Sequence, residues 1–104
     1  INSAKSYESI MKIILSASKG NADRLTRDMI SEHNITLPDA INEQGFRSTV
    51  MMSLPLIRNQ CSGHGAGAND NNVSLSLANL SFNLACTLNT YLIEEYKNKE
   101  SKEA

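Results

Sequence analysis

The sequence predicts an all-α protein, a bundle of four to five short helices. Apolar residues recur three and four positions apart in several segments, which is the spacing of one face of a helix. No segment alternates between apolar and polar residues for long enough to form a strand. The chain has 104 residues, 40% of them hydrophobic, and is therefore expected to form one domain (residues 1–104) with its own core.

The first helix is expected over residues 3–18, with Ser3 as its N-cap and Gly20 just beyond its end. Its apolar line contains Tyr7, Ile10, Ile14 and Ala17. Glu8 and Lys12 are four positions apart, so they are expected to form an ion pair on the helix surface. Such a pair stabilises a helix by about 0.3–0.5 kcal/mol.

The middle of the chain is expected to hold two further short helices. Residues 21–34 are weakly patterned, and their apolar face contains Leu25, Met29 and Ile30. Residues 36–39 contain a proline and are typical of a helix start. Ala40 and Ile41 are then expected to face the core, and Gly45 to end this helix.

Residues 48–58 are predicted to be helical, but Pro55 lies inside the segment. A proline removes one backbone donor and clashes with the preceding turn. We therefore expect either a kink or a new helix that begins with Ser53 as its cap. Residues 59–72 are rich in Gly, Asn and Asp and are predicted to form a loop.

The clearest helix is predicted over residues 73–97. One apolar stripe contains Val73, Leu77, Leu80, Leu84, Leu88 and Tyr91. A second stripe contains Leu75, Phe82, Cys86 and Ile93, so we expect the helix to be covered on two sides. A polar line contains Asn79, Asn83, Thr87 and Thr90, which is either ordinarily exposed or part of a hydrated subunit interface.

The two ends of the sequence suggest the last domain of a longer protein. The chain begins without a Met, and residues 97–104 are charged and polar, typical of a frayed, solvated C-terminus. With a net charge of −1, the domain alone is expected to bind nucleic acid weakly. Two cysteines and no long apolar run favour the cytoplasm and exclude a membrane span.

The most informative pair of residues is Arg58 and His64, which are separated by five residues. A guanidinium binds phosphate through a planar set of donors. A histidine transfers protons near neutral pH. Asn59 can hydrogen-bond a phosphate or orient the imidazole, and Gly63, Gly65 and Gly67 let the backbone approach a phosphate closely. Together these residues are a minimal set for cleaving RNA without a metal. In the alternative that the spacing leaves open, Arg58 caps helix carbonyls and His64 packs in a turn.

One histidine cannot act as base and acid at the same instant. Two copies of the motif that face each other across a twofold axis would supply two histidines and two arginines. The chemistry therefore favours a homodimer with a shared site. In the alternative, Arg58 or water covers one proton transfer at a lower rate.

Three rival sites are weaker. Cys61 and His64 have half of a zinc-ligand spacing, but Cys86 and His33, needed to complete it, are single and remote in sequence. A metal nuclease needs clustered carboxylates, and Asp70 is alone near the loop. A nucleophilic Cys61 paired with His64 has no geometry defined by the sequence.

Several stretches resemble the C-terminal domain family of bacterial abortive-infection proteins. The specific block is Leu56-Ile57-Arg58-Asn59 followed by Gly63-His64-Gly65-Ala66-Gly67, an Arg-Asn pair and then His-Gly-x-Gly. Residues 4–12, 36–38, 83–88 and 91–92 are similar as well, so the resemblance touches most of the chain. This family is similar to the wider HEPN superfamily of all-α, usually dimeric bundles.

The resemblance implies a HEPN-like fold and a metal-independent endoribonuclease that acts in phage defence. Residue by residue, it implies that Arg58 and His64 are catalytic, and Asn59 matches the polar position after the arginine. It implies a contact from Glu8 in the first helix to the site or its RNA. No cofactor is implied, and the implied partners are RNA, a second copy of the chain and other domains of a longer protein. The alternative is a catalytically inactive HEPN-like module for dimerisation or for binding RNA or a nucleotide.

Overall fold

The computed structural model describes residues 2–62 and 74–103, and every described element is helical. The elements are α1 (Asn2–Leu15), α2 (Ala22–Ser31), α3 (Glu43–Phe46), the π-helix η1 (Arg47–Met51), α4 (Ser53–Ser62) and α5 (Leu75–Glu103). The all-α prediction is therefore confirmed. No helix within the described ranges is long and apolar enough to cross a membrane.

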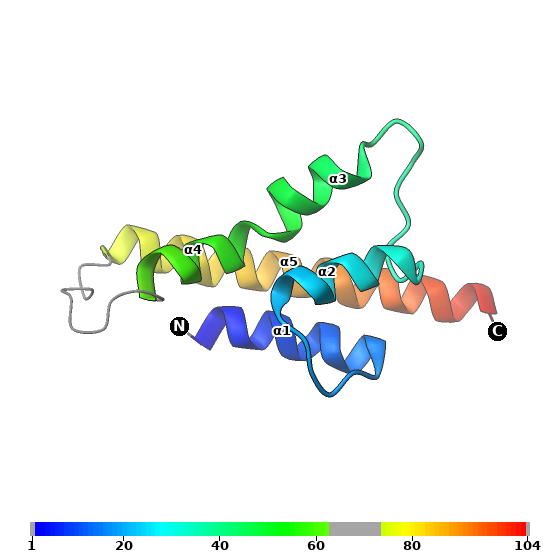
Figure 1. Cartoon of the computed structure of the whole chain (residues 1–104), viewed down its shortest axis with the longest axis horizontal. Helices are drawn as coiled ribbons and strands as arrows, with labels where there is room; N and C mark the ends of the chain where they lie inside the picture. The colour runs from blue at the N-terminus through cyan, green and yellow to red at the C-terminus, as the bar shows by residue number, and fades with distance from the viewer. Residues whose placement is uncertain (1, 63–73, 104) are drawn as a thin grey trace.

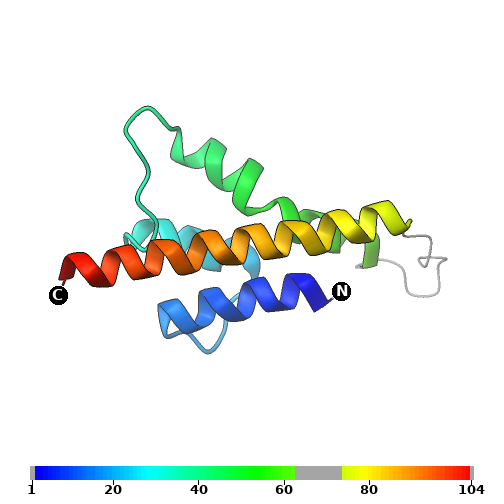
Figure 2. The same ribbon diagram turned by 180° about the vertical axis from the view of Figure 1, so that it is seen from behind.

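The long helix α5 forms the backbone of the bundle (Figures 1 and 2). Helix α1 packs along it, α2 covers α1, and α4 contacts both α1 and the first half of α5. Helix α3 and η1 form one continuous arm that rises away from the other helices (Figure 1). The arm leads directly into α4, so its attachment fixes where α4 begins.

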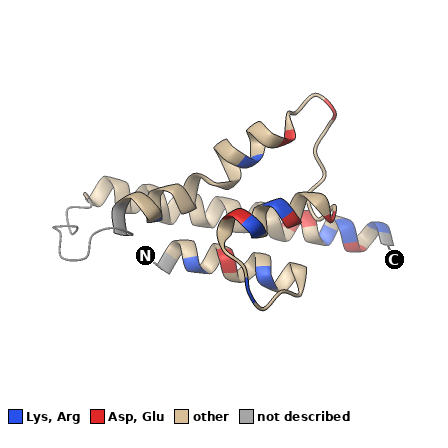
Figure 3. Cartoon of the chain, viewed as in Figure 1, with Lys and Arg blue, Asp and Glu red and all other residues tan. Residues whose placement is uncertain are grey.

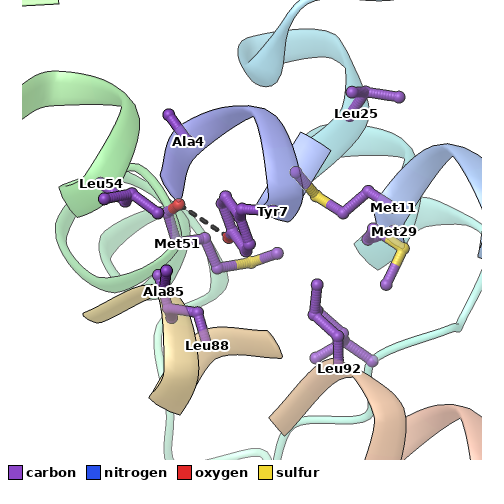
Figure 4. Close-up of a cluster of buried hydrophobic side chains, with 11 residues drawn as sticks. Ala4, Tyr7, Met11, Leu25, Met29, Met51, Leu54, Ala85, Leu88 and Leu92 are labelled. Atoms are coloured by element: carbon purple, nitrogen blue, oxygen red, sulfur yellow. Dashed lines mark hydrogen bonds between the residues drawn. The ribbon is translucent and has the colours of Figure 1, made fainter. Parts of the chain in front are cut away.

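The core lies where α1, α2, α4, α5 and the end of η1 meet (Figure 4). Its largest fully buried apolar side chains are Tyr7, Met11, Leu25, Met29, Met51, Leu54 and Leu92. The chain has no Trp, and flexible thioether side chains fill much of the centre. Aliphatic and Met side chains therefore build most of the core, as predicted.

Tyr7 contributes a buried polar side-chain group to this core, and that group has a partner. Its hydroxyl donates a hydrogen bond of 2.8 Å to the carbonyl oxygen of Met51 (Figure 4). Burial raises the pKa of Tyr7, with a smaller contribution from Tyr91, so the hydroxyl stays protonated and remains a donor. This bond ties α1 to the last residue of η1.

Helix α1 ends at Leu15, three residues earlier than predicted, because Ser16 adopts a left-handed conformation (φ 55°). Two bonds close the end: the N–H of Ala17 donates to Lys12 O (2.9 Å) and that of Ser16 to Ile13 O (3.2 Å). This is the Schellman arrangement. The predicted N-cap Ser3 lies inside α1, so that prediction was wrong.

Helix α2 confirms the amphipathic helix predicted within residues 21–34. Asn21 caps it by accepting a 2.9 Å hydrogen bond from the N–H of Arg24. Asp23, in the first turn, pairs with Arg47 of η1 at 2.8 Å and with Arg27 at 3.2 Å. These two guanidinium groups lower the pKa of Asp23, Arg47 first, so the carboxylate stays charged and links the arm to α2.

The helix predicted to begin at residues 36–39 is absent, because the next helix begins at Glu43. Asn42 is its N-cap and accepts a hydrogen bond of 2.6 Å from the N–H of Gly45. Gly45 thus lies inside α3 instead of ending a helix, and Ala40 and Ile41 are exposed instead of facing the core.

Contacts with α5 explain why residues 32–36 do not become helical. The N–H of Thr36 donates to the Glu95 carboxylate at 2.9 Å. The Lys99 ammonium donates to the side-chain oxygen of Asn34 at 3.0 Å and to the carbonyl oxygen of Glu32 at 3.3 Å. These long-range bonds fix the turn after α2 and the non-helical chain that follows it, and they override the local preference for a helix.

Pro55 lies in the first turn of α4, where its missing N–H has no helical partner to lose. Met52 interrupts the helical run, and α4 begins at Ser53, so the predicted restart is confirmed. Ser53 does not act as the expected cap, because its hydroxyl donates to the carbonyl oxygen of Val50 at 2.7 Å. Helix α4 continues to Ser62, so Asn59 is helical, contrary to the predicted loop.

Helix α5 extends from Leu75 to Glu103, and the C-terminal residues predicted to be frayed are helical as far as Glu103. The line that faces the core consists of Ser81, Ala85, Leu88 and Leu92. The second apolar stripe is exposed, with Leu75 at 77%, Phe82 at 61% and Ile93 at 41%. The predicted two-sided coverage is therefore wrong for a single copy of the chain. Asn79, Asn83, Thr87 and Thr90 are exposed as well.

We predict that Tyr7→Phe lowers the free energy of unfolding by about 1–2 kcal/mol, because it removes a buried hydrogen bond and strands a carbonyl oxygen. The matched control is Tyr96→Phe, which loses the exposed 2.7 Å bond to Glu100 and should cost less than about 0.5 kcal/mol. Urea unfolding followed by circular dichroism measures both values. Equal losses in the two variants would contradict the central role of the Tyr7 bond.

Candidate functional site

Arg58 lies on α4 and reaches across to α1. Its Nη1 atom is 2.7 Å from Oε2 of Glu8, an ion pair between two helices. The placement follows from the packing of both helices. Leu54, one turn before Arg58, is buried in the core, and Tyr7, next to Glu8, is buried as well. Both charged side chains therefore emerge at the edge of the contact between α1 and α4.

The pair is partly shielded from water. The side chain of Glu8 is 14% exposed and that of Arg58 is 28% exposed. Oε2 of Glu8 is itself inaccessible to solvent, and no N–H points straight at it, so the contact is mainly coulombic. Attraction between charges is stronger in such a setting than in bulk water and is less screened by salt.

The predicted surface pair between Glu8 and Lys12 is wrong. Glu8 turns towards Arg58 on the neighbouring helix, and within the described part of the chain no ion pair joins it to Lys12. The local spacing gave no indication of this contact, because Glu8 and Arg58 are far apart in sequence. Of the predicted site residues that lie within residues 2–62 and 74–103, Glu8 and Arg58 are brought together as an ion pair.

Among the other predicted site residues, one lies on α4 and the rest lie outside the described ranges. Asn59 follows Arg58 on α4 and is exposed. His64, Gly63, Gly65 and Gly67 lie outside the described residues, as does Asp70. The described portion of the site therefore consists of the end of α4 and the adjoining face of α1.

The candidate zinc ligands that the structure describes, His33 and Cys86, do not lie together. His33 borders a cavity of about 240 Å³ together with Thr36, Glu95 and Lys102. Cys86 lies nine residues before Glu95 on the same straight helix, which is roughly 14 Å along its axis. His33 and Cys86 are thus too far apart to share one ion. Among residues 2–62 and 74–103, no group of three potential ligands is placed to hold a metal.

The sequence gave no indication of a second feature, a cavity of about 540 Å³ between α2 and the arm. It is lined by Arg27, Ser31, His33, Glu43 and Arg47, among others. Arg58 does not border it, so this cavity is separate from the pair described above.

Comparison with protein families gives the same assignment as the resemblance in the sequence. The family model Abi_C, described as a HEPN-like domain, matches residues 1–96. The chain belongs to this family. Searches among curated proteins and among solved structures gave no match.

Membership in the Abi_C family fits the architecture of the bundle. The match spans all described elements from α1 to most of α5. It therefore includes both Glu8 and Arg58. The domain is a HEPN-like module related to abortive infection.

A double-mutant cycle tests the ion pair. We expect Glu8→Ala and Arg58→Ala each to destabilise the fold, and the double variant to be more stable than the sum of the two losses implies. The coupling energy should be about 1–3 kcal/mol, because neither side chain is more than a third exposed. The control cycle is the exposed pair Arg24–Asp28 on α2, for which about 0.3–0.5 kcal/mol is expected. Equal coupling energies in the two cycles would show that partial burial does not strengthen the Glu8–Arg58 ion pair.

Proposed function

We propose that this domain is a metal-independent endoribonuclease that acts in abortive infection against phage. The observation that carries the proposal is the position of Arg58 on the last turns of α4, where the carboxylate of Glu8 restrains it. A restrained guanidinium at the edge of a helix is suited to hold a phosphodiester. In sequence, His64 follows shortly after α4 ends.

The proposed reaction is an internal transesterification. The 2′-hydroxyl of the ribose loses its proton to a base and its oxygen bonds to the adjacent phosphorus. The bond from phosphorus to the 5′-oxygen breaks, and an acid protonates that oxygen as it leaves. The products are a 2′,3′-cyclic phosphate end and a 5′-hydroxyl end. No co-reactant is needed.

Each residue has a defined role in this proposal. The Arg58 guanidinium offsets the negative charge that builds on the phosphate oxygens as the new bond forms. His64 transfers a proton near neutral pH, and its counterpart in a second copy supplies the other transfer. Asn59, exposed next to Arg58, is in a position to hydrogen-bond the phosphate. Gly63, Gly65 and Gly67 let the backbone come close to the substrate.

The need for two histidines makes a homodimer part of the proposal, and α5 offers a surface for it. No residue from Leu75 to Ile93 is charged, although Leu75 and Phe82 are largely exposed. Figure 3 shows the result along α5: its charged residues lie towards the C-terminus, and the first half of this helix has none. Depletion of charge with exposed aromatic and aliphatic groups is typical of the centre of a protein interface.

Four polar residues of α5 lie beside this apolar stripe and are exposed, which suits a partly hydrated interface: Asn79, Asn83, Thr87 and Thr90. Other domains of a longer protein would supply the RNA capture and the trigger, since the net charge of −1 gives this domain little attraction for RNA. The proposal places the protein in the cytoplasm, with its two cysteines reduced.

The test of activity is RNA cleavage by the purified protein with EDTA present. We expect the wild type to leave 2′,3′-cyclic phosphate ends, and His64→Ala and Arg58→Ala each to lower the rate by about 100-fold or more. The matched controls are His33→Ala and Arg24→Ala, which change exposed residues of α2 and its following turn and should retain full activity. Cleavage that survives both site substitutions would refute the assigned residues. A wild type that binds RNA without cutting it would favour the inactive binding module.

The test of the dimer is Phe82→Asp. This substitution places a charge in the middle of the exposed apolar stripe, so we expect the protein to become monomeric and to lose cleavage while keeping its helical content. Ile41→Asp, at a 42% exposed position just before α3, is the control and should leave the molecular mass in solution unchanged. Light scattering after gel filtration measures the oligomeric state. A dimer that persists in Phe82→Asp would rule out this face.

A further inference from the structure

We propose that the cavity between α2 and the arm of α3 and η1 is a binding site for a phosphorylated sugar. The cavity has a volume of about 540 Å³, within the range of small-molecule sites in proteins. Both walls contribute lining side chains: Arg27, Ile30 and Ser31 from α2, and Glu43, Gln44 and Arg47 from the arm. Arg58 does not border this cavity, so the site is separate from the proposed nuclease site and does not depend on RNA cleavage.

One carboxylate holds the two arginines of this cavity in place. Oδ1 of Asp23 lies 2.8 Å from Nη1 of Arg47, and its Oδ2 lies 3.2 Å from Nε of Arg27. Nη1 of Arg47 also donates to Oγ1 of Thr26 at 3.3 Å, and Thr26 is fully buried. Because both guanidinium groups contact the same carboxylate, they lie next to each other at the wall of the cavity.

Each guanidinium keeps one edge, with two nitrogen donors, for a ligand. Within residues 2–62 and 74–103, no acceptor is bonded to Nη1 and Nη2 of Arg27 or to Nε and Nη2 of Arg47. Such an edge binds one pair of oxygens through parallel hydrogen bonds. One edge is enough for a carboxylate, whereas a phosphate with three terminal oxygens can accept from both. Two neighbouring edges therefore favour a phosphate group.

The arm places acceptors beside the two arginines. Glu43 and Gln44 are exposed, and among residues 2–62 and 74–103 neither side chain makes a hydrogen bond or an ion pair. Glu43 lies four residues before Arg47 on the continuous arm, which is roughly 6 Å along its axis. A carboxylate repels a phosphate but accepts hydrogen bonds from sugar hydroxyls. The Gln44 amide is both donor and acceptor, as a hydroxyl is, so this end of the cavity suits hydroxyl groups better than an ammonium group.

The charges around the cavity predict selectivity for the whole ligand. The carboxylates of Asp23 and Glu43 balance the guanidinium groups of Arg27 and Arg47, and Figure 3 shows acidic and basic residues on both α2 and the arm. Inorganic phosphate should therefore bind weakly, because it gains the two arginine edges but is repelled by Glu43. A phosphorylated sugar gains the same edges and also donates its hydroxyls to Glu43.

The experiment is isothermal titration calorimetry of the purified chain with ribose 5-phosphate, inorganic phosphate and ribose as separate probes. We expect ribose 5-phosphate to bind with a Kd below about 1 mM, and about tenfold or more tightly than either of the other two. Arg27→Gln removes one free edge at an exposed position and should raise this Kd about 10-fold or more. Arg24→Gln makes the same change of charge on α2 outside the cavity, so it should leave the Kd unchanged. Equal Kd values for wild type and Arg27→Gln would overturn the proposal.

Glu43→Gln separates a specific contact from a general loss of folding. It should weaken the binding of ribose 5-phosphate, because a strong acceptor for hydroxyls is lost, and strengthen that of inorganic phosphate, because a repelling charge is removed. A variant that merely folds less well would weaken both. Stronger binding of both probes, or tighter binding of phosphoethanolamine than of ribose 5-phosphate to the wild type, would rule out the sugar.

Amide chemical shifts locate the bound probe. Ribose 5-phosphate should shift signals of α2 and α3, and shifts confined to α4 around Arg58 would overturn the assigned cavity. Two RNA trinucleotides identify the source of the phosphorylated sugar. Binding that requires a 5′-phosphate on the trinucleotide supports an RNA end as the ligand. Binding of ribose 5-phosphate but of neither trinucleotide supports a free sugar phosphate.

Discussion

The hydrogen bond from the buried hydroxyl of Tyr7 to the carbonyl oxygen of Met51 is the contact on which the arrangement of the site depends. It joins the middle of α1 to the junction where η1 ends and α4 is about to begin. Because α1 carries Glu8 and α4 carries Arg58, this attachment and the buried Leu54 together set the geometry of the ion pair. A buried polar bond defines such a junction more sharply than apolar packing does, since a misplaced partner would leave two groups unsatisfied.

The helices could be predicted where the apolar period was long and regular, as in α1 and α5, and α2 could be predicted from a weaker pattern. Their ends could not, because each depends on a single local geometry. The left-handed Ser16 stops α1 early, and Asn42 starts α3 where no apolar pattern marks a boundary. The stretch around Thr36 resembles a helix start in sequence but is held in a non-helical conformation by Glu95, a residue remote along the chain. Contacts between residues remote in sequence cannot be predicted from a pattern of neighbouring residues.

The site residues, like the helices, could be predicted only in part from the sequence. Arg58 could be singled out by its chemistry and its place before a glycine-rich loop, and the structure puts it at the edge of a helix contact. The spacing along α1 wrongly paired Glu8 with Lys12. The family resemblance implied a contact from Glu8 to the site, and the packing of α1 on α4 brings Glu8 to Arg58. Likewise, a periodic stripe that contains Phe82 reveals apolar character but not whether the same chain covers it. Sequence patterns report which faces are apolar, and the topology decides which of them remain open.

The arm formed by α3 and η1 makes few tertiary contacts with the rest of the molecule. The ring of Phe46 lies 6.1 Å from that of Tyr91, and Arg47 pairs with Asp23. Beyond these points the arm stands clear of the bundle (Figure 1). Local unfolding begins where such tertiary contacts are sparse. Melting of the arm would therefore stop at the core residue Met51, and the guanidinium beyond it would keep its orientation. The arm can therefore change in length or sequence without moving Arg58 at the other end of α4.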